Sequence, residues 1–110
     1  MKRTLVIDDL RSLKHDAGLV VYARTALEGL RHLKSGESWD VLYLDHDLGA
    51  KDDVRAVVRY LEEKAFNGEP LKIGRIILIT MNPVGSKWII QGLERYYSIT
   101  TAPSPLLVSI

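Results

Sequence analysis

The sequence contains no cysteine, which excludes disulfides, thiolate metal ligands and cysteine nucleophiles. It also lacks an excess of either charge, because 15 Lys and Arg against 14 Asp and Glu give a formal net charge of +1 at pH 7. This is too little to attract the chain to nucleic acid or an acidic membrane over long range. The longest apolar runs, such as Arg75 to Met81, are too short to span a bilayer. Any ligand preference must therefore come from local groups of residues.

The N-terminus lacks the features of a secretory signal. Met1, Lys2 and Arg3 lead directly into Thr4 to Ile7 and two aspartates, without a long apolar segment or a small-residue cleavage site. We therefore expect a cytoplasmic protein. A chain of 110 residues suffices for one hydrophobic core, and we expect a single domain over residues 1–110.

Short apolar runs rich in β-branched residues predict buried strands of a parallel sheet. They lie at residues 5–7, 19–22, 41–44 and 76–79. The segments between them predict helices: one opens with a capping box at Thr25 to Glu28, a second runs from about Asp53 to Asn67 and Gly68, and a third starts near Ser86. This alternation predicts a three-layer α/β domain.

Two segments are less regular. Residues 10–18 leave little room between the first two strands and have weak helical periodicity, so we expect the first crossover helix to be shortened or missing. After the prolines at 103 and 105, Leu106 to Val108 form either a last strand or a packing arm.

Acidic residues follow two of the predicted strands directly. Asp8 and Asp9 come after the first strand, and Asp45, His46 and Asp47 come after the third. Ligands bind outside the carboxyl ends of the strands in open parallel sheets, so both groups should meet at one edge. Either pair alone would be ordinary turn residues. Together they predict an Mg²⁺ site formed by Asp8, Asp9, Asp45 and Asp47, because a hard cation with oxygen ligands relieves the repulsion between carboxylates.

The segment from Thr80 to Lys87 joins the fourth strand to a helix and predicts an anion site. Small and polar residues before a helix N-terminus offer backbone amides to a phosphate, so we expect Asn82, Gly85 and Ser86 to bind one. The alternative is a plain turn with Ser86 as the helix cap. Arg11 is a candidate phosphate clamp because its planar fork suits two oxygens, although it is equally well explained as a surface arginine.

His46 lies between two aspartates and is a candidate acid or base, together with Asp45 as the candidate catalytic carboxylate. Alternation along the strand can instead turn His46 away from the site.

The order of these residues resembles the receiver domains of two-component response regulators. Asp8 and Asp9 correspond to the metal-binding acids, Asp45 to the phosphoacceptor aspartate and Thr80 to the switch hydroxyl that contacts the phosphoryl group. The resemblance extends to about Tyr97. It implies a flavodoxin-like fold, an Mg²⁺ cofactor and phosphoryl transfer to the aspartate.

The sequence departs from the standard receiver in ways that indicate a divergent branch. Ala102 precedes Pro103, where receivers place a lysine, and Asp45 is followed by His46-Asp47-Leu48-Gly49. With residues 8–11 and 81–85, this pattern is more similar to the cyclic-phosphate-processing receiver family, which is named from predicted association with cyclic phosphates of RNA ends or nucleotides. A histidine often occupies the place of Thr80 in that family.

Three functions remain open from the sequence. The first is an Mg²⁺-dependent enzyme acting on a phosphate ester, such as a cyclic phosphate of RNA or a nucleotide. The second is a stand-alone receiver phosphorylated on Asp45, and the third is a pseudo-receiver that only binds a nucleotide or a protein. The expected partners are thus a phosphate-containing small molecule, an RNA end or another protein, with neither a membrane segment nor a DNA-binding element.

Overall fold

The computed structural model describes residues 2–9, 11–13, 18–45, 48, 54–79, 83–101 and 107–109. For Arg11, Pro83 and residues 107–109 it describes the main chain alone. The elements, in chain order, are β1 (Arg3–Ile7), β2 (Arg11–Leu13), β3 (Leu19–Ala23), α1 (Ala26–Leu33), β4 (Trp39–Leu44), α2 (Arg55–Phe66), β5 (Ile73–Leu78), α3 (Pro83–Leu93), β6 (Ile99–Thr101) and β7 (Leu107–Ser109).

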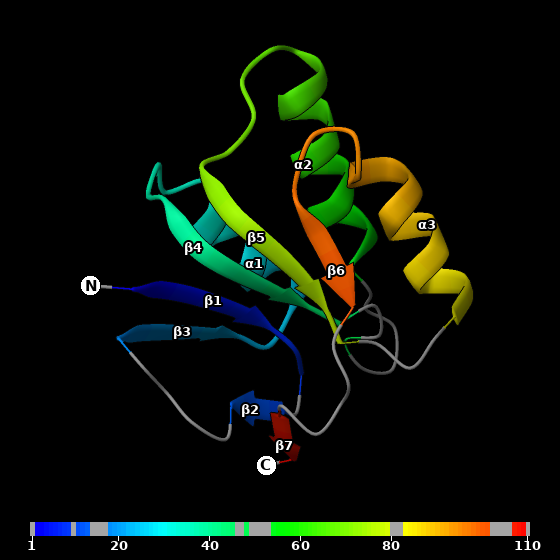
Figure 1. Cartoon of the computed structure of the whole chain (residues 1–110). Coiled ribbons are helices and arrows are strands. Elements are labelled where there is room, and N and C mark those ends of the chain that lie inside the picture. Colours follow the sequence, from blue (N-terminus) through cyan, green and yellow to red (C-terminus); the bar gives the residue numbers. More distant parts are fainter. Residues whose placement is uncertain are drawn as a thin grey trace.

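A five-stranded parallel sheet forms the centre of the molecule, in the order β3-β1-β4-β5-β6 (Figure 1). The predicted apolar runs all become strands of this sheet, which confirms the flavodoxin-like α/β fold expected from the sequence. All neighbours in the sheet are parallel, so every strand points its carboxyl end toward the same edge. That edge is where the candidate site lies.

The three helices pack side by side on one face of this sheet (Figure 1). They cover alternate residues of the central strands, and these residues are fully or almost fully buried: Leu5, Ile7, Leu42, Leu44, Ile76 and Leu78. On the helix side, Val57, Val58 and Leu61 of α2 and Ile89 and Leu93 of α3 complete the core, as their helical spacing predicts.

The opposite face is covered differently. There β2 pairs with β7 in a small antiparallel sheet, and Leu13 of β2 packs against a second apolar cluster of Val41, Ile77 and Ile79. Arg11–Leu13 is therefore a strand where a receiver would start its first crossover helix, and residues 14–17 lie outside the described part of the chain. The tail segment at 107–109 is a strand, which decides between the two alternatives left by the sequence.

The helix boundaries confirm one prediction from the sequence and correct another. Thr25 caps α1, and its Oγ1 accepts a hydrogen bond of 3.1 Å from the Glu28 N–H, whereas the Glu28 carboxylate accepts from the N–H of Arg24, one residue before the cap. Helix α3 begins at Pro83 and not near Ser86, because proline is well suited to a first helical position. Ser86 therefore lies inside the first turn, and its prediction as the cap is wrong.

Candidate functional site

The first part of the site is made by the ends of β1 and β4. Ile7 lies opposite Leu44 in this parallel pair, so Asp8 and Asp45, the next residues, leave the sheet side by side. Their main chains are still held in the ladder: the Asp8 N–H donates to the Ala23 carbonyl at 3.1 Å, and the Asp45 N–H donates to the Ile7 carbonyl at 3.0 Å. The sheet thus fixes the positions from which both carboxylates project.

Asp8, Asp9 and Asp45 form one carboxylate cluster. Each offers a carboxylate oxygen, and these oxygens all lie within 4.8 Å of one another. Asp8 is fully buried and Asp45 is 8% exposed, whereas Asp9 is half-buried. Ionised carboxylates this close repel one another, and burial makes the repulsion stronger.

The donor set of the carboxylate cluster fits a hard divalent cation. Mg²⁺ takes oxygen ligands, is usually bound through one or two carboxylates and keeps several waters. Three carboxylates at the open edge of a sheet, one of them half-buried, meet these demands. Softer metals would prefer thiolate or imidazole ligands, and the described residues bring neither to this cluster.

Arg24 lies next to the carboxylate cluster and was missed by the sequence analysis. It follows β3, and its Nη1 donates to the main-chain oxygen of Asp8 at 3.1 Å while its Nη2 donates to Ser12 Oγ at 3.0 Å. Its guanidinium lies over the ring of Tyr22, 4.9 Å from the centroid. Part of the signal was present in the sequence, because Arg24 comes two residues after the predicted strand at 19–22, at the same edge of the sheet as the acidic residues.

The structure gives less information about the other predicted site residues. Gly85 is buried and Ser86 half-buried in the first turn of α3, which follows β5 at the same edge of the sheet. The main chain of Arg11 opens β2. Four predicted residues lie outside the described residues: His46, Asp47, Thr80 and Asn82.

The comparison with protein families decides the classification. The family model for the cyclic-phosphate processing receiver domain matches residues 3–95. The chain belongs to this family. The match includes all three residues of the carboxylate cluster, as well as Arg24 and the first turn of α3. Searches of curated proteins and of solved structures give no match.

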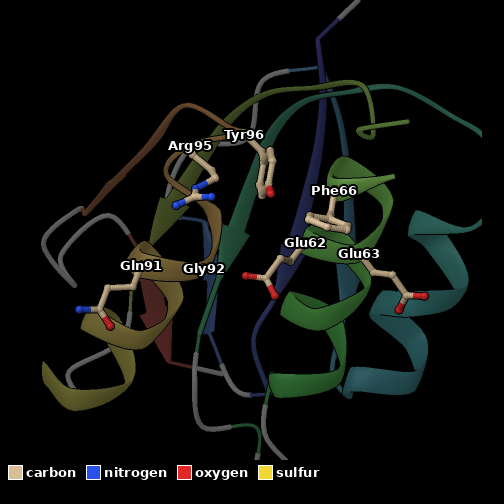
Figure 2. Close-up of a pocket in the computed structure, with 7 residues that line it drawn as sticks. All are labelled: Glu62, Glu63, Phe66, Gln91, Gly92, Arg95 and Tyr96. Carbon is tan, nitrogen blue, oxygen red and sulfur yellow. The ribbon is translucent and has the colours of Figure 1, made fainter. Parts of the chain in front are cut away.

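A separate hollow of about 480 Å³ lies between α2 and α3 of the receiver domain (Figure 2). It is lined by Glu62, Glu63, Phe66, Gln91, Gly92, Arg95 and Tyr96. Figure 2 shows the Glu62 carboxylate of α2 directed toward α3, and the Arg95 guanidinium on the turn that follows α3. No member of the carboxylate cluster lines this hollow, so its size alone does not make it the site of phosphate chemistry.

None of the helices in the described part of the receiver domain has the length and apolarity needed to cross a bilayer.

Proposed function

We propose that this receiver domain is a Mg²⁺-dependent protein that acts on a phosphate ester, such as a cyclic phosphate of RNA or of a nucleotide. The observation that carries the proposal is the carboxylate cluster, whose three oxygens lie within 4.8 Å of one another. Membership of a family described as processing cyclic phosphates supports the choice of substrate class.

Asp8, Asp9 and Asp45 would hold the ion, with Asp47 as the predicted fourth carboxylate. A bound Mg²⁺ would supply positive charge to the oxygens of a phosphate ester and thereby stabilise the charge that develops on them. The buried positions of Asp8 and Asp45 limit the movement of these carboxylates, which favours a fixed ligand geometry.

The protein's own groups would act on the substrate from two sides. We assign Asp45 the role of nucleophile or of the group that orients a water, and His46 that of the proton carrier. The first turn of α3 follows β5 at the same edge of the sheet, and the N-terminus of a helix favours an anion. Gly85 and Ser86 lie in that turn, and we assign them phosphate binding together with Arg11, Thr80 and Asn82.

The first test is thermal unfolding with and without Mg²⁺. A ligand that binds only the native state at a hundred times its Kd adds about 2.7 kcal/mol of stability, which for a domain of this size raises the Tm by roughly 10 °C. We expect this rise in the wild type and its loss in the double variant Asp8→Asn, Asp45→Asn. Glu62→Gln, on the exposed face of α2, is the matched control and should keep the full rise. A wild type whose Tm does not respond to Mg²⁺ would contradict the proposal.

Two further measurements separate turnover from signalling. Hydrolysis of a nucleoside cyclic phosphate should require Mg²⁺ and should disappear in Asp45→Asn. Beryllofluoride, which mimics an aspartyl phosphate, should add little stability beyond that of Mg²⁺. Strong stabilisation by beryllofluoride without turnover would instead identify Asp45 as a phosphoacceptor.

A further inference from the structure

The side chain of Arg24 connects three strands at the edge that carries the carboxylate cluster. It reaches from the end of β3 to the carbonyl of Asp8 after β1 and to the hydroxyl of Ser12 in β2. We infer that Arg24 is a positioning residue for the carboxylate cluster and sets its affinity for Mg²⁺. This inference rests on the proposed function, because it assigns a role within the same site.

The contacts of Arg24 fix the main chain on which Asp8 and Asp9 lie. One end of the guanidinium fork holds the Asp8 carbonyl, and the other holds β2, which starts two residues after Asp9. The Arg24 guanidinium also makes a cation–π contact with the ring of Tyr22. The Tyr22 hydroxyl also accepts a hydrogen bond of 3.3 Å from the Leu13 N–H. The segment from Asp8 to Leu13 is thus attached to β3 at both of its ends.

The geometry requires an arginine. A guanidinium presents several N–H groups in a rigid plane, so it can donate to two acceptors on different elements at once. A lysine ammonium retains the charge but not the planar fork, and its flexible stem cannot hold both acceptors in the same arrangement. Groups that orient metal ligands in this way typically change metal affinity by 10- to 100-fold when they are replaced.

A role through charge alone predicts the opposite sign. A fixed cation beside a cation site repels the incoming ion, so removal of the Arg24 charge by itself should tighten Mg²⁺ binding. A positioning role predicts that binding weakens although this repulsion is gone. The direction of the change therefore distinguishes the two roles.

The experiment is calorimetric titration of Mg²⁺, without substrate, into four variants of the full chain. We expect Arg24→Met and Arg24→Lys to raise the Kd by about 10- to 100-fold. Ser12→Ala, which removes one of the two side-chain contacts, should raise it less. Tyr97→Phe removes buried hydrogen bonds of a side chain that packs in the helix-side core. It controls for general loss of stability and should bind Mg²⁺ as the wild type does.

The outcomes separate the inference from the proposed function. Unchanged or tighter Mg²⁺ binding by Arg24→Met, with normal binding by the wild type, overturns the positioning role and leaves the metal site intact. A wild type that does not bind Mg²⁺ overturns both. If Arg24→Met does not fold, Arg24→Lys and Ser12→Ala carry the test, and wild-type affinity in both of these overturns the inference. An equal loss in Tyr97→Phe would also overturn it, because the effect would then follow stability alone.

Discussion

The hydroxyl of Tyr97 joins two segments that are distant in the chain. It donates to the Leu61 carbonyl of α2 at 2.9 Å and accepts from the Leu71 N–H, just before β5, at 3.2 Å. The tyrosine side chain is 7% exposed and packs in the helix-side core. A single buried hydroxyl thus connects a carbonyl of α2 with a main-chain N–H that lies before β5.

Tyr97→Phe should destabilise the fold because it leaves both main-chain partners without this hydrogen bond. A buried polar group that loses its partner costs about 1–3 kcal/mol. We expect a loss of about that size in the free energy of unfolding, measured by urea denaturation. A loss below about 0.5 kcal/mol would show that water replaces the hydroxyl at this position.

The same hydroxyl should make stability depend on alkaline pH. Burial raises the pKa of Tyr97 above its ordinary value of 10.0; the hydrogen bond from Leu71 acts against this rise, and nearby Tyr60 adds to it. Above pH 10 the unfolded tyrosine releases its proton while the folded one keeps it, so stability falls as the pH rises toward the raised folded pKa. Urea unfolding at about pH 8 and about pH 10.5 should show a larger fall in wild type than in Tyr97→Phe. An equal loss of unfolding free energy in both proteins would show that Tyr97 does not cause the pH dependence.

At the level of single residues, the sequence was informative where a simple rule applied. Asp8, Asp9 and Asp45 were predicted to meet because they directly follow parallel strands, and their oxygens do lie together. Arg24 follows a strand of the same sheet, yet its two acceptors are a main-chain carbonyl and a serine of β2. Main-chain carbonyls leave no pattern in a sequence, so this contact could not be predicted from residue types.

Among the elements, α1 illustrates how closely helix and sheet approach. Gly29 faces β1, and a Cβ at this position would lie 2.6 Å from Ile7 Cδ1 and 3.2 Å from Ile7 Cγ1. Ile7 is fully buried, so its side chain has little room to move away. The absence of a side chain at Gly29 therefore sets the distance between α1 and β1.

Gly29→Ala should be destabilising despite the better helix propensity of alanine. The propensity gain is at most about 1 kcal/mol, whereas overpacking of a filled core costs about 1–3 kcal/mol. We expect a net loss of about 1 kcal/mol in urea denaturation. Combining Gly29→Ala with Ile7→Val, which removes the Cδ1 atom, should recover part of the loss. If the losses of stability of the two single variants simply add in the double variant, the contact with Ile7 does not cause the loss in Gly29→Ala.

The longer elements were predictable, whereas β2 was not and β7 was only one of two alternatives. The strands with continuous apolar runs and the helices with repeated apolar positions, such as Val57, Val58 and Leu61, carry their own signal. β2 and β7 have three residues each and are stabilised by a partner at the other end of the chain. The pairing of such distant short segments is not encoded in local periodicity, so β2 could not be foreseen as a strand.

For the molecule as a whole, the two faces of the central sheet pack against different elements. All helices of the described chain lie on one face, and Leu13 of the β2–β7 sheet contributes to the cover of the other. The candidate site lies where β1 and β4 end, next to β2. Its carboxylates belong to the central strands, whereas Arg24 and Ser12 connect them to the second cover.

The pairing of β2 with β7 also bears on the order of folding. β1 and β4 are joined by a moderate length of chain, and the helix between them forms from local contacts. β2 and β7 come from opposite ends of the sequence, so their pairing must close the longest loop in the molecule and is entropically the most expensive contact to nucleate. We therefore expect the carboxylates that follow β1 and β4 to come together before the small antiparallel sheet closes over the second face.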